Sequence, residues 1–357
     1  MSGYKTIEWL DGVVRMLDQR LIPHQICYQN YTHYEEVALA IQTMVIRGAP
    51  AIGAAAAYGL ALAALGSSTS EPKALKDELH KAARTLNAAR PTAANLKWAL
   101  DRVLVSLDDP SLGTVTAIKK RILAEAQAIA TEDVQANRQI GLNALPLIPH
   151  RARIVHHCNT GALATVDYGT ALGVIRSAHE HGRDVHVYVD ETRPRLQGAR
   201  LTTWELGQLG IAYTLIVDGA SGYFMRQVGV DLCLVGCDRV AANGDTANKI
   251  GTYNLALVAH AHQVPFFVAS PTSTIDLSLP SGDQIDIEQR DPAEVLLING
   301  ERIAPAEAQA ANPAFDITPA RYITAIITEK GIAYPPFSES LPELVLAGRD
   351  GSWQTST

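Results

Sequence analysis

Two hydrophobic patterns divide the chain. In the N-terminal part, apolar side chains recur every three to four residues, the spacing of amphipathic helices. This pattern predicts helices over 33–46, 49–65, 72–89, 94–107 and 115–143. Before them, residues 6–10 and 13–17 alternate around Asp11-Gly12, a combination that favours a β-hairpin. We therefore expect a mostly helical N-terminal domain with a short antiparallel sheet, over residues 1–148.

From about residue 150 the pattern becomes a repeat of short apolar run, polar loop and helix. The apolar runs cover 153–157, 185–189, 213–217, 232–235 and 265–269. Runs of this length without alternation are typical of parallel strands buried on both faces. Right-handed crossovers then give a Rossmann-like doubly wound α/β sheet, which we expect over residues 149–357. We interpret 318–330 as a further helix.

Composition narrows the class of protein. The chain has 357 residues, a net charge of −7 and a pI near 5.9, which argue against nucleic-acid binding. The most apolar stretch, 49–65, is about half alanine and contains Gly53 and Gly59, so we expect a buried helix rather than a membrane span. The first ten residues show no leader pattern. The cysteines are scattered without a CxxC motif, which indicates reduced thiols in the cytoplasm and no structural zinc.

The carboxyl ends of parallel strands meet at one edge of a sheet, where ligands bind. The loops at that edge would begin at Cys158, Asp190, Asp218, Asp238 and Ser270. We expect 158–162 to open a helix, whose dipole would favour the Cys158 thiolate. The N–H groups of Gly161 and Ala162 could then cradle an anion. The alternative is that Cys158 is a small buried apolar residue. His156 and His157 point to opposite faces of a strand, and no ligand spacing supports a metal there.

Asp238 is a candidate acid, because apolar walls would raise its pKa and keep a proton available near neutral pH. It could equally cap its loop. Asn248 and Lys249 suit a phosphate or sugar hydroxyls, although Lys249 alone would be an ordinary surface lysine.

Two arginines of the N-terminal half stand out. Arg47 precedes Gly48-Ala49-Pro50 between two apolar helices, and Arg90 ends a helix. The pair could close over a phosphate at the sheet edge, or each could be a solvent-facing charge at a helix end. No GxGxxG follows a strand and no P-loop motif is present, which disfavours dinucleotides and nucleoside triphosphates.

Several long blocks together resemble the methylthioribose-1-phosphate isomerase family. They are RGAPAIG (47–53), CNTGALAT (158–165), DETRPRLQGARLT (190–202), GCDRVAANGDTANKIGT (236–252) and NPAFDITPARYIT (312–324). The resemblance covers nearly the whole chain, in order. It implies the two-domain fold above, a homodimer, no metal or nicotinamide, and a place in methionine salvage. The same superfamily contains regulatory subunits of translation initiation factor 2B and archaeal ribose-1,5-bisphosphate isomerases.

The resemblance also implies roles for individual residues. Cys158 and Asp238 match the catalytic pair. The matched substrate-binding positions are Arg47, Gly48, Ala49, Arg90, Gln197, Asn248 and Lys249. Cys237 departs from the pattern, where a small alanine is expected. The implied reaction converts 5-methylthioribose 1-phosphate to 5-methylthioribulose 1-phosphate, with Asp238 protonating the ring oxygen and Cys158 acting as base or transition-state stabiliser. Alternatives are a related sugar 1-phosphate, or a non-catalytic regulatory subunit.

Overall fold

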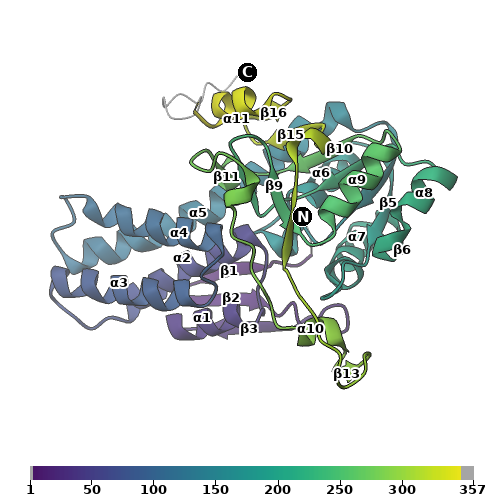
Figure 1. Cartoon of the computed structure of the whole chain (residues 1–357). Coiled ribbons are helices and arrows are strands. Elements are labelled where there is room, and N and C mark those ends of the chain that lie inside the picture. Colours follow the sequence, from purple (N-terminus) through teal and green to yellow (C-terminus); the bar gives the residue numbers. More distant parts are fainter. Residues whose placement is uncertain (1–2, 347–357) are drawn as a thin grey trace. The chain divides into compact units, whose positions relative to one another are not determined.

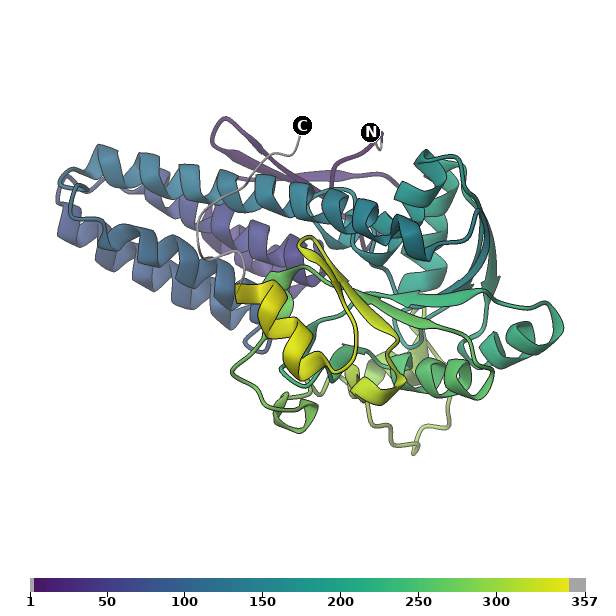
Figure 2. The ribbon, with the colours of Figure 1, turned by 90° about the horizontal axis from the view of Figure 1, so that it is seen from above.

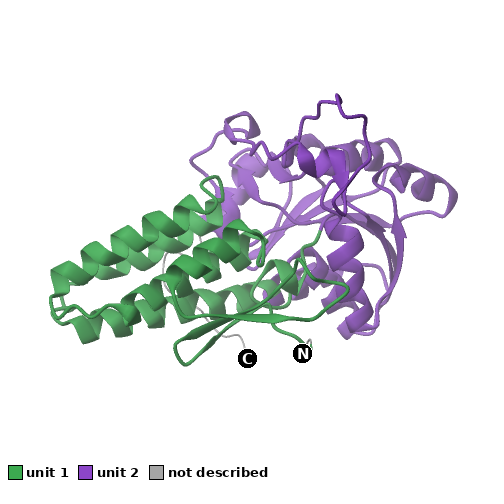
Figure 3. Ribbon diagram, turned by 90° about the horizontal axis from the view of Figure 1, so that it is seen from below, with its two compact units in different colours: residues 1–137, 159–169 green, residues 138–158, 170–357 purple. Residues whose placement is uncertain are grey.

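The computed structural model describes residues 3–346 and divides the chain into two compact units (Figure 3). Unit 1 comprises Met1–Asn137 and Asn159–Gly169, and unit 2 comprises Arg138–Cys158 and Thr170–Thr357. The sequence indicates a single boundary after residue 148. The structure instead changes unit within a long helix, and the segment after Cys158 returns to unit 1.

Unit 1 joins a three-stranded antiparallel sheet to a group of helices (Figure 1). The strands are β1 (Ile7–Leu10), β2 (Val13–Leu17) and β3 (Tyr28–Tyr31), in the order β1-β2-β3. The helices are α1 (Tyr34–Gln42), α2 (Ala49–Gly66), α3 (Pro72–Ala88), α4 (Ala94–Val105) and most of α5 (Val115–Ala144). The predicted hairpin and all five predicted helices are confirmed, and the helices of this unit run side by side in Figure 2.

The helix α2 forms the centre of unit 1. It packs against α1, α3 and α4, and most of its residues are buried. Its small residues allow this close approach: a Cβ on Gly59 would lie 2.8 Å from the Leu86 side chain. Among the described helices, α2 alone is long and apolar enough to cross a membrane, but 72% of it is buried inside the fold. The interpretation of this stretch as a core helix is confirmed.

Unit 2 is built on a seven-stranded sheet with the order β16-β15-β10-β7-β4-β5-β6. The strands are β4 (Arg151–His156), β5 (Asp184–Asp190), β6 (Ala212–Ile216), β7 (Leu232–Val235), β10 (Phe266–Ala269), β15 (Ala325–Thr328) and β16 (Gly331–Ala333). All neighbouring pairs are parallel except β15 with β16. The doubly wound parallel sheet expected from the five apolar runs is therefore present.

Alternate residues of each strand face two separate apolar cores. On β7, Leu232 and Leu234 join one core, whereas Cys233 and Val235 join the other. The first core includes residues of α6 (Ala171–Glu180), α7 (Thr203–Leu209) and the end of α5. The second includes α8 (Ser221–Gln227), α9 (Thr252–Ala261) and α11 (Phe337–Leu346). Helices thus cover both faces, which explains why the strands read as continuous apolar runs.

Three features of unit 2 differ from the sequence-based expectation. The helix expected over 318–330 is wrong, because its apolar centre forms the parallel strand β15. A four-stranded sheet, in the order β11-β8-β9-β14, occupies what was expected to be loop. Its strands are β8 (Arg239–Ala241), β9 (Thr246–Lys249), β11 (Ile275–Asp276) and β14 (Phe315–Thr318). A short helix, α10 (Ala293–Leu296), and the hairpin of β12 (Leu297–Ile298) with β13 (Glu301–Arg302) also follow β11.

Candidate active site at the carboxyl edge of the sheet

The sheet of unit 2 has its topological switch between β4 and β7. The chain runs outward from β4 through β5 and β6 on one side, and through β7, β10 and β15 on the other. Ligands of doubly wound folds bind outside the carboxyl ends of the strands at such a switch. Cys158 follows β4 and Asp238 follows β7, and these strands pair in parallel with His156 opposite Leu234. Two residues distant in sequence therefore leave the sheet at one edge, from neighbouring strands.

The backbone around Cys158 is held tightly. Cys158 is 5% exposed and has a φ of +68°, a left-handed conformation that costs an L-residue about 1–2 kcal/mol. Its N–H donates to the Thr192 hydroxyl at 2.9 Å, and its carbonyl accepts a hydrogen bond from the Thr202 hydroxyl at 2.7 Å. Thr192 lies in the loop after β5, and Thr202 ends the helical segment Gly198–Thr202 that leads into α7. The segment between β5 and α7 therefore fixes the direction in which Cys158 leaves its strand, a role the sequence did not reveal.

The helix expected to begin at Cys158 is wrong. The segment after Cys158 contains only a three-residue 3₁₀ turn at Ala162–Ala164, and the long helix α6 begins at Ala171. Such a turn has no appreciable helix dipole, so the dipole argument for a Cys158 thiolate is lost. Gly161 lies beside Gly169, and the carbonyl of Ala162 accepts a hydrogen bond from the Thr6 hydroxyl. Anion binding by the N–H groups of Gly161 and Ala162 stays a prediction, which no longer has the support of a helix N-terminus.

Asp238 lies at the start of the β8–β9 hairpin. Its N–H donates to the carbonyl of Ala247 at 2.9 Å, and Arg239 pairs with the same residue. By this register Asp238 lies next to Asn248 across the hairpin. The hairpin therefore places three predicted site residues, Asp238, Asn248 and Lys249, at one end of a rigid element.

Asn248 and Lys249 are both held by neighbouring groups. Asn248 is 3% exposed and donates to the Thr252 hydroxyl at 3.0 Å. The Lys249 ammonium donates to the carbonyl of Ala314 at 2.6 Å and lies 4.4 Å from the Phe315 ring centroid. Lys249 is thus half-buried and oriented, unlike an ordinary surface lysine.

Gln197 offers an unused buried acceptor. It is 7% exposed, and its Oε1 has no hydrogen-bond partner. A buried carbonyl oxygen without a partner costs about 1–3 kcal/mol, so a ligand donor at this position would relieve the deficit. The next residue must be glycine, since a Cβ on Gly198 would overlap the carbonyl of Asp190.

In unit 1, the segment Arg47–Ala49 forms the N-terminal end of α2. The Arg47 guanidinium donates to both the side-chain and main-chain oxygens of Asn159, the residue after Cys158. Gly48 has a φ of +96°, and a Cβ there would overlap the carbonyl oxygen of Ala164. Arg90 follows the C-terminal end of α3 and is half-buried. Arg47 is therefore at a helix N-terminus, where an anion is favoured, and not at a helix C-terminus.

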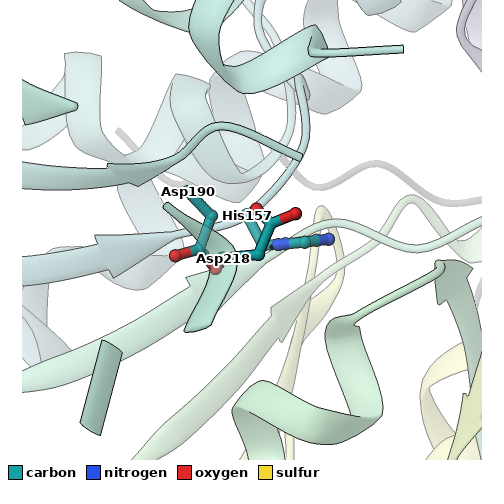
Figure 4. A group of neighbouring side chains, drawn as sticks. All are labelled: His157, Asp190 and Asp218. Carbon is teal, nitrogen blue, oxygen red and sulfur yellow. Dashed lines mark hydrogen bonds and ion pairs between the residues drawn. The ribbon is translucent and has the colours of Figure 1, made fainter. Parts of the chain in front are cut away.

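Among the described residues, one group of three potential metal ligands lies together: His157, Asp190 and Asp218, with ligand atoms within 4.8 Å of one another (Figure 4). The ring of His157 contacts Asp190 Oδ2 through Nδ1 at 3.0 Å and the Ile250 carbonyl through Nε2 at 2.9 Å. Both Asp218 oxygens accept backbone N–H groups, from Thr192 and Arg193. A metal bound by His157 would have to displace one of the two hydrogen bonds of its ring. The group is therefore better explained as a hydrogen-bonded cluster, and it shows that the ends of β4, β5 and β6 converge.

Burial sets the protonation of two residues in this region. Burial lowers the pKa of His156 to about 4, so its ring is neutral, with Nδ1 near the Leu234 carbonyl. Burial also raises the pKa of Cys237 to about 12. A hydrogen bond with Ser270 lowers this pKa, and the charge of neighbouring Asp238 raises it further. The Cys237 thiol is thus protonated at neutral pH.

Comparison with known proteins places this arrangement in a family. The family model described as "Initiation factor 2 subunit family" matches residues 45–335. A methylthioribose-1-phosphate isomerase from Synechococcus sp. is 57% identical, over 97% of this chain and 99% of that protein.

Two solved structures have the same fold. The 5-methylthioribose 1-phosphate isomerase of Pyrococcus horikoshii is 46% identical, with a TM-score of 0.91 over 96% of both chains. A structure described as translation initiation factor eIF-2B, subunit delta, from A. fulgidus is 41% identical, with a TM-score of 0.86 over 96% of this chain and 100% of that one. The chain therefore belongs to the initiation factor 2 subunit family and, within it, to the methylthioribose-1-phosphate isomerases.

Proposed function

We propose that this protein converts 5-methylthioribose 1-phosphate to 5-methylthioribulose 1-phosphate. The relative and the solved structure named for this isomerase support the proposal. The observation that carries it is the placement of Cys158 and Asp238 on neighbouring strand ends at the switch of a doubly wound sheet. We extend the proposal to the pathway and setting, namely methionine salvage in the cytoplasm, by a homodimer that needs no metal or nicotinamide.

The chemistry requires an acid and a hydrogen transfer. The anomeric oxygen of the substrate carries the phosphate, so the sugar cannot open spontaneously to an aldehyde. Asp238 donates a proton to the ring oxygen as the bond between that oxygen and C1 breaks. The hydrogen on C2 then arrives at C1, and the C2 hydroxyl loses its proton to become the ketone.

Cys158 serves the hydrogen transfer by one of two routes. As a thiolate it removes the C2 proton and returns it to C1 through an enediolate. Alternatively, a hydride shifts directly from C2 to C1 and Cys158 stabilises the transition state. Substrate deuterated at C2 separates them: full retention at C1 indicates the hydride shift, and loss of label to water requires a base.

Other residues bind the substrate. Arg47, Gly48 and Ala49 surround the N-terminus of α2, an 18-residue helix whose free N–H groups favour a phosphate. Arg90 and Lys249 add positive charge. Asn248 and Gln197 provide amide groups for sugar hydroxyls, and the unused Oε1 of Gln197 is the clearest acceptor among them.

The rival function is that of a non-catalytic regulatory subunit, which the name of the A. fulgidus structure raises. Such a subunit has no need of a buried, partnerless Gln197 oxygen or of a buried cysteine whose backbone is fixed at the sheet edge. A close enzymatic alternative is a related sugar 1-phosphate, because none of the proposed binding residues is assigned to the 5-substituent.

The deciding experiment is an isomerisation assay on purified protein, with product followed by NMR. We expect 5-methylthioribose 1-phosphate to be converted, with kcat in the range of about 1–1000 per second that is typical of enzymes. A panel with 5-deoxyribose 1-phosphate and ribose 1,5-bisphosphate identifies the preferred 5-substituent. Protein that converts none of the three would exclude the isomerase and support the regulatory subunit.

A further inference from the structure

One buried group lies beside the catalytic pair but has no role in the chemistry above. His157 immediately precedes Cys158, and its side chain is only 1% exposed. Both ring nitrogens are engaged, Nδ1 with Asp190 at 3.0 Å and Nε2 with the Ile250 carbonyl at 2.9 Å. Ile250 directly follows Asn248 and Lys249. One ring therefore connects the end of β4, the end of β5 and the substrate-binding end of the β8–β9 hairpin.

The partners determine where the protons of this ring lie. A carbonyl only accepts hydrogen bonds, so Nε2 carries a hydrogen. Asp190 Oδ1 is already an acceptor for the Ser221 hydroxyl at 3.2 Å, which leaves Oδ2 to share a proton with Nδ1. The two groups are 1% and 2% exposed, so an unshared charge on either would be costly.

The charges around the ring favour keeping that proton. The facing groups are Asp190 at the end of β5, Asp218 just after β6, Asp316 on β14, Lys249 at the end of β9, and the neutral His156. Burial opposes protonation of His157, but its hydrogen bond to Asp190 and the nearby carboxylates raise its pKa overall. The pKa of Asp190 is also raised, in this case by burial itself. Both shifts retain a proton in the pair.

The segment on the other side of the ring is fixed as well. Asp316 accepts the N–H groups of Gly251 and Tyr253, at 2.8 and 3.1 Å. A Cβ on Gly251 would lie 2.9 Å from His157 Cε1, so only glycine allows this approach. The turn from Lys249 to Gly251 is thus clamped between His157 and Asp316.

We propose that His157 is a positioning residue: through Asp190 and the Ile250 carbonyl, its ring holds the Cys158 end of β4 in register with the segment that carries Asn248 and Lys249. This inference rests on the proposed isomerase function, because the register matters only if these residues act on one substrate. It assigns His157 no contact with the substrate.

Two substitutions separate the two bonds of the ring. The amide of His157→Asn lies near the position of Nδ1 and loses the bond to Ile250, whereas the amide of His157→Gln reaches toward the position of Nε2 and retains a donor there. We expect KM to rise about tenfold in His157→Asn, the scale of one buried hydrogen bond, and to stay within about twofold in His157→Gln. His156→Asn is the matched control: we expect it to lower Tm about as much as His157→Asn does, and to leave KM unchanged.

The outcomes are distinguishable. If wild type is active and both His157 variants have the KM of wild type, the positioning role is overturned. An inactive wild type would instead refute the proposed function. If the variants do not fold, wild-type protein labelled with ¹⁵N-histidine provides the test. A persistent Nε2–H signal across neutral pH supports the clamp, and its absence overturns it.

Discussion

At the scale of single residues, the site uses side chains whose behaviour is set by burial. Adjacent histidines differ completely: the neutral His156 packs between strands, and His157 shares a proton with Asp190. Adjacent Cys237 and Asp238 differ in their proposed roles. The thiol of Cys237 is kept protonated, while the carboxyl group of Asp238 is the proposed proton donor.

The raised pKa of Cys237 predicts that its thiol reacts slowly with alkylating reagents. A rise from 9 to about 12 reduces the thiolate fraction near pH 8 about a thousandfold. We expect a maleimide or iodoacetamide reagent to label Cys237 in the folded protein at least about a hundredfold more slowly than in urea. Peptide mass spectrometry measures this, with Cys237→Ala identifying the peptide. Equally fast labelling in both states would show that the thiol is not protected.

At the scale of elements, the segment after β7 combines a catalytic candidate with a rigid support. The β8–β9 hairpin places Asp238 beside Asn248, and β14 pairs with β9, the second strand of this hairpin. In unit 1, the start of α2 is equally constrained, because Gly48 packs directly on the backbone of Ala164. The glycine of the β8–β9 turn, Gly244, is likewise closely packed, but against the side chain of Phe337.

Two glycines allow the contact at α2 to be measured. Gly12 and Gly48 both have positive φ angles, of +91° and +96°, but a Cβ would enter open space at Gly12 and overlap the backbone of Ala164 at Gly48. We expect Gly12→Ala to cost about 1–2 kcal/mol of unfolding free energy from backbone strain alone. Gly48→Ala should cost more than about 4 kcal/mol, because its methyl group adds this overlap to the strain. Urea unfolding gives both values, and similar losses would refute the contact.

These elements also show what the sequence could and could not reveal. The buried strands and amphipathic helices were predictable, since their apolar spacing reflects burial directly. Strand β15 was not, because a buried apolar run of only four residues cannot be distinguished from a buried helical turn by its periodicity. The small sheet around Asp238 was missed, because Asp, Asn and Gly residues indicate a turn but do not show that the residues on either side of it form paired strands. The bonds of His157 depend on residues 33 and 93 positions away, which no local pattern encodes.

At the scale of the whole molecule, the order of the strands brings the candidate chemistry together. Cys158 and Asp238 are far apart in the chain, yet they follow hydrogen-bonded neighbours β4 and β7. The fold and the family both match the methylthioribose-1-phosphate isomerases. The same fold in a protein named as a translation factor shows that the fold alone does not determine the activity.

The central claim is that Asp238 donates the proton that opens the ring. The most direct measurement compares turnover and substrate binding in wild type and Asp238→Asn, with Asp276→Asn as a control that removes a carboxylate from β11 of the same small sheet. The asparagine keeps the shape but has no acidic proton. We predict that Asp238→Asn loses at least about a thousandfold in kcat and binds substrate within about threefold of wild type, while Asp276→Asn stays active. Turnover near the wild-type rate in Asp238→Asn would contradict the account.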